Sequence, residues 1–462
     1  MRRMSENKKP KILGIIVLVA ISLFIFSSAE VVNSVGETEG AAKIAVKPLA
    51  VINYSQSANE QFSVNVTAFN ATNLHGFRLR LTFDANLLEC VTVQEGMLLQ
   101  AFDSTVMAQT VNNISGNIET SVNLTSPEAE VSGNNTLLGL VFRVKGTGET
   151  TLRLDELALY NSAGSFLPYV VYDGYFSNKF IFDVTMPLAL FCVTLVSIFL
   201  NQKTEGKLKS TLEKKELRAK DGALLVGLMV VMISVIAFFR QAVAPLMILF
   251  LFSYSMLLFM FTYIFSNKRW YLAILPPAIF VLPYIFFRTT DIWSEGLVNV
   301  YGVIFAILIT LYIANLFSWK STLIFTGLLT IVDIIMVLVT GWMVQAAEAT
   351  AGLSLPVIVE LPLVPLIVMG GGRLLRMGLG LGDFFFAGLL AIQTYKKYGK
   401  RFMLVSLVGM ALSFFIFEAI NLTYWKIPFP GTLMIICGWL PVATFRIIKD
   451  RKHKSSMIIP TQ

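Results

Sequence analysis

Two apolar segments decide the fold. Residues 322–344 read TLIFTGLLTIVDIIMVLVTGWMV, and residues 378–395 read GLGLGDFFFAGLLAIQTY. Each is close to the length of about 20 residues that a helix needs to cross a hydrocarbon core of about 30 Å. Each also contains one aspartate, Asp333 or Asp383, although a carboxylate at mid-membrane costs on the order of 3 kcal/mol. The pattern predicts two membrane helices whose charged residues have a functional role.

Comparable apolar stretches follow one another through the chain after Lys179. The chain is 55% hydrophobic and 14% charged, whereas a soluble domain is about a quarter charged. A further apolar segment, 355–369, is interrupted by Pro356, Glu360, Pro362 and Pro365, which favours an interfacial or re-entrant stretch. We therefore expect an all-α bundle of nine transmembrane helices within 181–446, near residues 181–200, 222–240, 243–266, 270–287, 298–317, 322–344, 378–395, 402–420 and 430–446.

Lysine and arginine are unevenly divided between the two sets of loops. One set of loops includes the connection 201–221 and the basic tail 447–462. It holds 19 lysine and arginine residues when the tail is counted from Arg446, and the other set holds six. Cytoplasmic loops carry such an excess. We therefore expect a multi-pass protein of the cell membrane with its C-terminus in the cytoplasm. The net charge of +8 is then explained by the basic residues in the cytoplasmic loops, and no nucleic-acid partner is predicted.

The first 29 residues are typical of a secretory signal peptide. A basic start precedes an apolar run from Ile12 to Phe26, and the small residues Ser27, Ser28 and Ala29 follow. An uncleaved signal anchor is the alternative. Either places the next segment outside the cell, and that segment has a different composition, with 15 acidic and 7 basic residues between Glu30 and Asn178.

Residues 40–178 alternate between apolar and polar side chains, as in the runs that begin at Phe62, Phe77, Leu138 and Thr151. Several short runs of period two, separated by turn residues, predict an extracellular antiparallel β-sandwich. Cys90 is the one cysteine in this segment, so no disulfide framework is expected. Six N-glycosylation sequons agree with export; they are at Asn53, Asn65, Asn70, Asn113, Asn123 and Asn134.

The order of features in this segment resembles a cohesin domain. A strand at Phe62 is followed by the run Asn73–Asp84, then Leu87-Leu88, a turn at Gly96 and the run Leu137–Gly146. Cohesins bind dockerin partners, so the resemblance implies a binding module with an extracellular ligand. A sandwich without a dedicated partner is the alternative.

Asp333 and Asp383 are expected at similar depths. Asp333 lies nine residues, roughly 13 Å, before Trp342, taken as a marker of the outer interface, and Asp383 lies about 8 Å below the outer start of its span. Two close carboxyls share a proton, so one can activate water while the other donates to a peptide carbonyl. The alternative is that each aspartate lines a water-filled pathway or an ion relay. Glu418, near the outer end of its span, is expected at the interface.

The segment around Asp383 resembles the glycine-x-glycine-aspartate motif of presenilins and signal peptide peptidases. Gly380, Leu381, Gly382 and Asp383 fill the motif, and Asp333 matches the aspartate of the preceding family span. The family's aspartates lie in the sixth and seventh of nine spans, as expected here. Its proline-alanine-leucine motif is degenerate in this chain, where Pro428 and Pro430 stand at that place.

This resemblance implies an intramembrane aspartyl endopeptidase that uses Asp333 and Asp383 and no cofactor or metal. The loop charges match the orientation of signal peptide peptidases, so the implied substrates are transmembrane helices or signal-peptide remnants with a cytoplasmic N-terminus. The combination with an ectodomain suggests an archaeal type of cell envelope by analogy. We also consider that the β-prone segment Val364–Met369 pairs with an unwound substrate as an added strand, against an ordinary interfacial loop.

Other chemistries fit less well. His75 and His453 both lie outside the expected spans, which excludes an intramembrane metalloprotease or a serine-histidine protease. A prepilin or preflagellin peptidase also uses a glycine-x-glycine-aspartate motif, but those enzymes have fewer spans and cut near the cytoplasmic face. An adhesion or transport protein with proton-relay aspartates is the non-enzymatic alternative.

Overall fold

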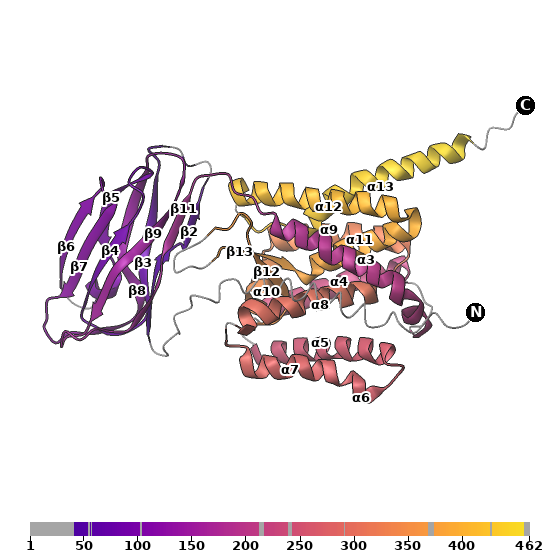
Figure 1. Cartoon of the computed structure of the whole chain (residues 1–462), viewed down its shortest axis with the longest axis horizontal. Coiled ribbons are helices and arrows are strands. Elements are labelled where there is room, and N and C mark those ends of the chain that lie inside the picture. The colour runs from indigo at the N-terminus through magenta and orange to yellow at the C-terminus, as the bar shows by residue number, and fades with distance from the viewer. Residues whose placement is uncertain are drawn as a thin grey trace, which may run out of the picture.

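The computed structural model describes residues 41–53, 56, 58–101, 104–211, 217–238, 243–290, 292–367, 374–425 and 427–456. The expected signal peptide, residues 1–29, lies outside the described residues. The described chain forms a β-sandwich, from Ala42 to Ser177, followed by a helical part that begins at Thr185 (Figure 1).

The sandwich consists of two sheets, one of five strands in the order β10-β1-β3-β8-β5 and one of six in the order β2-β11-β9-β4-β7-β6. Its elements are β1 (Ala42–Lys47), β2 (Ala50–Ile52), β3 (Gln61–Leu74), β4 (Gly76–Thr82), β5 (Leu88–Glu95), α2 (Met97–Gln100), β6 (Thr105–Asn112), β7 (Asn117–Leu124), β8 (Val131–Val144), β9 (Glu149–Tyr160), β10 (Tyr169–Tyr172) and β11 (Gly174–Ser177).

The predicted alternation is confirmed in these strands. On β4, Phe77, Leu79 and Leu81 are buried in the core between the sheets, whereas Arg78 is exposed. The expectation of a purely antiparallel sandwich is wrong at two pairs, since β1 pairs with β10 and β2 with β11 in parallel. These pairs join the first two strands to the last two, which the chain brings alongside them from the far end of the domain.

The helical part contains α3 (Thr185–Thr211), α4 (Ala219–Phe238), α5 (Val243–Phe265), α6 (Trp270–Ala273), α7 (Leu275–Phe287), η2 (Ile292–Leu297), α8 (Val298–Ile313), α9 (Trp319–Ile334), η3 (Ile335–Val339), α10 (Trp342–Ala351), α11 (Leu381–Tyr398), α12 (Lys400–Ile420), η5 (Asn421–Trp425) and α13 (Gly431–Ser456). Within the described ranges, eight helical stretches are long and apolar enough to cross a membrane. The seventh expected span, 378–395, corresponds to α11, which does not belong to these eight.

Helix α11 differs from the others because it has 18 residues and carries Asp383, Lys396 and Lys397. It is also the helix at the centre of the part, with every residue from Phe384 to Thr394 buried. The expected span 378–395 therefore begins too early, since its first three residues belong to a strand, β13 (Arg376–Gly380). The sixth expected span ends earlier than predicted, because Gly341 adopts a φ of +67° and Trp342 starts the separate helix α10.

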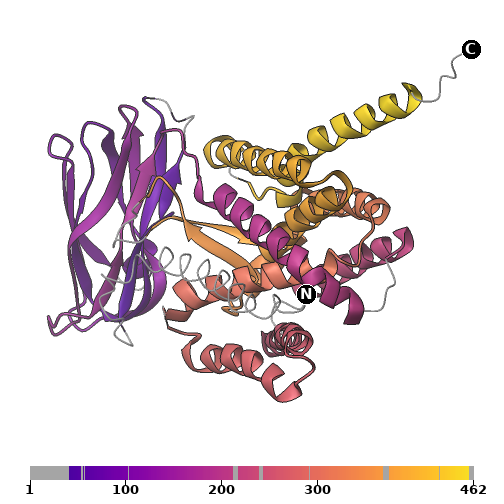
Figure 2. The same ribbon diagram turned by 45° about the vertical axis from the view of Figure 1, so that its right-hand side comes forward.

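A two-stranded hairpin lies among the helices, in contact with α3, α8 and α11, on the side of the helical part that faces the sandwich (Figures 1 and 2). It pairs β12 (Ile358–Pro362) with β13 in antiparallel register, with Glu360 opposite Gly378. The segment considered for pairing with a substrate, Val364–Met369, is described as far as Ile367 and forms a loop there, whereas the strand that pairs within the chain, β12, precedes it.

That loop contacts the connection between the two parts of the chain. Tyr175 and Ile181 form a small apolar cluster with Leu363 and Ile367. Asp183 Oδ1 accepts hydrogen bonds from the backbone N–H groups of Thr185 and Val364, at 2.9 and 3.1 Å. The end of the sandwich is thus attached to the loop beyond the hairpin.

Glu418, expected near the outer interface of the membrane, is buried within the protein. Its side chain is 1% exposed, and within the described part of the chain neither carboxyl oxygen has a hydrogen-bond partner. It interacts electrostatically with Asp183, which is itself fully buried. Phe182 in the same connection packs on Phe415 of α12, a tertiary contact that the apolar pattern of α12 alone does not reveal.

Candidate active site

Asp333 lies near the C-terminal end of α9, and its residue is 7% exposed. Its Oδ2 accepts a hydrogen bond of 2.5 Å from the hydroxyl of Thr432. The backbone N–H of Thr432 also bonds to the Asp333 carboxyl. The buried carboxyl thus receives two donors from one residue that is 99 positions away in the sequence.

Asp383 is the third residue of α11, directly after the hairpin. Its carboxyl returns to the backbone N–H of Gly380, the residue that precedes the helix. This bond satisfies a group that a helix leaves unpaired at its start. The backbone N–H of Leu381 donates to the carbonyl of Val357 at 3.1 Å, which anchors the same turn to the chain before β12.

The two aspartates interact electrostatically with each other. They come from helices that both pack against α13 and against one another. The structure therefore brings Asp333 and Asp383 to one site, and the hairpin belongs to the connection between their helices.

The start of α13 completes the site. Gly431 is its first residue, and a Cβ built there would lie 2.6 Å from Cγ and Oδ1 of Asp383. The next residue, Thr432, contacts Asp333. The first two residues of one helix therefore contact one aspartate each. The positive end of a helix dipole, which favours negative charge, also lies beside the pair.

The motif glycines have different surroundings. A Cβ at Gly378 would lie 2.9 Å from Ile358 Cγ2 within the hairpin, and one at Gly380 would lie 3.4 Å from Asp383 Oδ2. At Gly382 an added Cβ would meet no described atom within 4 Å, whereas Leu381 is buried in the helical core. Among the described residues, no side chain or backbone atom therefore fills the space beside Gly382.

The prolines of the degenerate motif precede α13. Pro430 is buried, and its carbonyl accepts from the backbone N–H groups of Leu433 and Met434 at 3.2 and 3.3 Å. Pro428 is exposed. Pro430 therefore supports the site by starting the helix whose first residues contact the aspartates.

Sequence reasoning selected the two prolines but missed Gly431 and Thr432. The signal that pointed to them was their position directly after the prolines. Among the described residues, no group of three or more histidine, cysteine, aspartate or glutamate side chains could hold a metal ion. What the arrangement offers chemically is a pair of interacting carboxyls with unequal donors.

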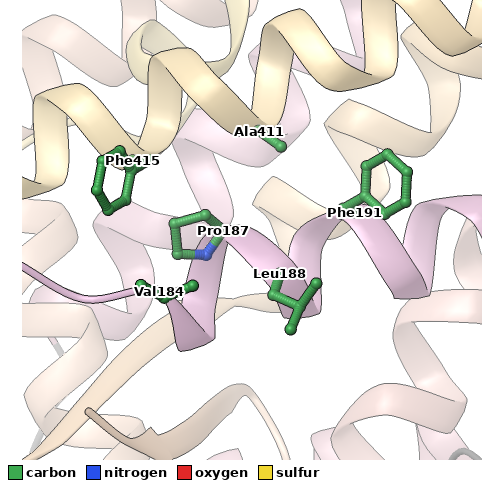
Figure 3. A pocket seen from close by; sticks show the side chains of 6 residues that line it. All are labelled: Val184, Pro187, Leu188, Phe191, Ala411 and Phe415. Atoms are coloured by element: carbon green, nitrogen blue, oxygen red, sulfur yellow. The ribbon is translucent and has the colours of Figure 1, made fainter. Parts of the chain in front are cut away.

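A separate groove lies between α3 and α12 (Figure 3). It has a volume of about 340 Å³, and its lining side chains are all apolar: Val184, Pro187, Leu188, Phe191, Ala411 and Phe415. Neither aspartate lines it. We assign no chemistry to this groove, because it contains no polar side chain.

The sequons of the sandwich fall into two groups. Asn65, Asn70 and Asn134 are exposed, whereas Asn53, Asn113 and Asn123 are half-buried. The amide of Asn113 bonds to both backbone groups of Cys90, at 2.8 and 3.0 Å. Burial raises the pKa of the Cys90 thiol to about 11, so this free cysteine stays protonated at neutral pH.

Comparison with known proteins concerns the sandwich. The family model described as the Cohesin domain matches residues 49–165. Similar solved structures include a non-cellulosomal cohesin from the archaeon Archaeoglobus fulgidus, at 21% identity over 29% of this chain and 89% of that one, with a TM-score of 0.25.

Two further similar structures are bacterial. A type I cohesin–dockerin complex from Clostridium thermocellum is 14% identical over 30% of this chain and 96% of that one, with a TM-score of 0.26. A type II cohesin domain from the cellulosome of Acetivibrio cellulolyticus is 15% identical over 30% and 94%, with a TM-score of 0.26. A search of curated proteins found no match. Residues 49–165 of this chain are a cohesin domain, followed by a helical region with several long apolar helices.

Proposed function

We propose that the helical part is an intramembrane aspartyl endopeptidase in which Asp333 and Asp383 activate water. One observation carries the proposal: two acidic side chains on apolar helices interact with each other and both contact the first two residues of α13. Two carboxyls in a low-dielectric site cannot both ionise cheaply, so they hold one proton between them. That state suits acid and base catalysis on a peptide bond.

The substrates in this proposal are single transmembrane helices or signal-peptide remnants, as the resemblance to signal peptide peptidases implies. The excess of lysine and arginine in alternate loops supports a cytoplasmic C-terminus and an extracellular sandwich. Under that orientation the hairpin and the aspartates lie toward the outer face, beneath the cohesin domain.

The hairpin favours the idea that an unwound substrate adds as a strand. The edge that would receive it is that of β13, instead of Val364–Met369. The backbone N–H of Glu360 donates to Asn299 Oδ1 at 2.7 Å, so it points away from β13. In an antiparallel ladder, two directly opposite residues either both hydrogen-bond across the pair or both direct their backbone groups outward. Gly378, which is opposite Glu360, therefore directs its backbone groups away from β12. A substrate strand along that edge would lead to Asp383, five residues later.

The experiment is a cleavage assay in proteoliposomes with a synthetic transmembrane peptide labelled at both ends. We expect wild-type cleavage, and loss of cleavage in Asp333→Asn and in Asp383→Asn. Glu348→Gln, an exposed carboxylate on α10, is the matched control and should cleave normally. Undiminished cleavage in either aspartate variant would reject the proposal.

The same assay separates the remaining alternatives. A protein whose aspartates carry protons or ions would leave the peptide intact while the aspartate variants lose ion or proton flux across the liposome. An enzyme of the prepilin peptidase kind would cut near the cytoplasmic end of the peptide, which mass spectrometry of the products identifies.

A second function belongs to the cohesin domain, which we propose as a binding module for a dockerin-type partner. The match at residues 49–165 favours it, and one of the similar structures is a cohesin bound to a dockerin. The test is retention of the purified chain on a panel of immobilised dockerin modules. Saturable retention that free dockerin competes away would support the proposal, and no retention on any module would count against it.

A further inference from the structure

Thr432 is the second residue of α13 and donates its hydroxyl to Asp333 Oδ2 at 2.5 Å. The residue is buried, with 5% of its surface exposed. A threonine at this position has no counterpart in the sequence pattern that identified the aspartates. In the structure, the hydroxyl of Thr432 nevertheless bonds directly to the Asp333 carboxyl.

The two aspartates receive unequal support. Asp333 accepts from both the hydroxyl and the backbone N–H of Thr432. Asp383 accepts from the backbone N–H of Gly380 and otherwise faces Gly431, which offers no side chain. Hydrogen bonds donated to a carboxylate favour its ionised form and are about twice as strong as neutral ones. The asymmetry therefore favours the negative charge on Asp333.

We infer that Thr432 is a positioning residue that keeps Asp333 ionised as the base, leaves the shared proton on Asp383 as the acid, and so sets the pH range of the site. The inference rests on the proposed function. It assigns each carboxyl one role instead of leaving the two interchangeable.

The proton steps balance under this assignment. Asp333 takes a proton from water as the water oxygen attacks the peptide carbonyl carbon, and Asp383 gives its proton to the carbonyl oxygen. When the C–N bond breaks, Asp333 returns its proton to the leaving nitrogen, and Asp383 recovers one from a hydroxyl of the diol. The pair ends in its starting state.

The other charged residues on the helices around Asp333 do not account for the placement of the negative charge on Asp333. Helix α9 packs against α4, α11, α13 and η3. The charged residues of α4 lie in its first turn, where Gly222 packs on Ser321 at the opposite end of α9. The charges of α13 lie in its C-terminal half, η3 has none, and the lysines of α11 are in its last turn. Asp383 remains as the titratable group that interacts with Asp333.

The test is the pH dependence of kcat/KM for Thr432→Val, which keeps the shape of the side chain but removes the hydroxyl. We expect kcat/KM to fall roughly tenfold or more at neutral pH, since a hydrogen bond to a charged group is lost. The acid limb of the profile should move to higher pH by about one unit, because ionised Asp333 loses a donor. Thr432→Ser should restore both.

Thr330→Val is the matched control. Thr330 is also buried on α9, three residues before Asp333, but its hydroxyl donates to the carbonyl of Thr326 at 2.9 Å. This variant should keep the wild-type profile. A wild-type pH profile in Thr432→Val would overturn the inference. If the aspartate variants are inactive in the same experiment, the proposed function stands and the inference alone fails.

A second measurement does not depend on the folding or activity of the valine variant. Infrared difference spectra of the purified chain report the C=O stretch of a protonated carboxyl. We expect that band to be lost in Asp383→Asn and retained in Asp333→Asn. Loss of the band in Asp333→Asn with retention in Asp383→Asn would reverse the assignment and reject the inference.

Discussion

Gly431 lies directly against the carboxyl of Asp383. A Cβ at Gly431 would be 2.6 Å from Cγ and Oδ1 of Asp383 and 2.8 Å from Oδ2, closer than non-bonded atoms approach. The first residue of α13 must therefore be glycine for Asp383 to keep its present position beside Asp333.

Gly431→Ala should displace the Asp383 carboxyl and reduce cleavage by at least about 100-fold, because a misplacement of 1 Å at a reacting group can cost that much. Gly227→Ala is the control, since an added Cβ on α4 meets no described atom within 4 Å. Cleavage and thermal unfolding are measured together. A folded Gly431→Ala protein with normal cleavage would contradict the geometry.

Helices α12 and α13 touch through their backbones where Gly409 meets Gly438. A Cβ on Gly438 would lie 2.1 Å from the carbonyl oxygen of Gly409. We expect Gly438→Ala to destabilise the chain by about 1–3 kcal/mol through overpacking, measured by thermal unfolding in detergent. Gly206→Ala on α3, where a Cβ meets no described atom within 4 Å, should not. An equal effect of the two changes would show that the crossing is not tight.

Asp183 connects α3 to the loop that follows β12. Its carboxylate accepts from the N–H groups of Thr185, Met186 and Val364. Asp183→Ala should cost about 1–2 kcal/mol for the lost cap and should speed hydrogen exchange at Val364 and Met186. Asp183→Asn keeps an acceptor and should have the smaller effect. Unchanged exchange at Val364 in Asp183→Ala would show that the loop is held by other contacts.

Glycosylation, where the chain is expressed in a host that adds N-glycans, should follow exposure of the sequons. Asn65, Asn70 and Asn134 are exposed and should be occupied in glycopeptide mass spectrometry. Asn113 should stay unmodified in the folded chain, because its amide nitrogen donates to the Cys90 carbonyl. Asn123, which accepts from the hydroxyl of Tyr160, should be poorly occupied. High occupancy at Asn113 would contradict the described packing.

The features that depend on local patterns could be predicted from the sequence. Alternation of period two located β3, β4, β8 and β9, because one face of each strand is buried. The proximity of Asp333 and Asp383 was also predictable, since two helices joined by one loop are natural neighbours. The parallel pairing of β1 with β10 was not, because its partners are more than 120 residues apart.

The missed features arise from tertiary packing. Thr432 and Gly431 meet the aspartates through the placement of α13, which a degenerate proline motif does not specify. Glu418 is buried and interacts electrostatically with Asp183, which comes from a distant part of the sequence. Helix α11 is enclosed by its neighbours but carries Asp383, Lys396 and Lys397, and it is not among the eight stretches of the described residues that are long and apolar enough to cross a membrane.

The central claim is that Asp333 and Asp383 form one catalytic pair, and binding of a transition-state analogue tests it most directly. The probe is a peptide with a hydroxyethylene group in place of the scissile bond, compared with the same peptide lacking the hydroxyl. We predict that wild type prefers the hydroxyl compound by about 100-fold or more, and that Asp333→Ala and Asp383→Ala each abolish this preference. Equal binding of the two peptides to wild type, or a preference that survives in either folded variant, would contradict the account.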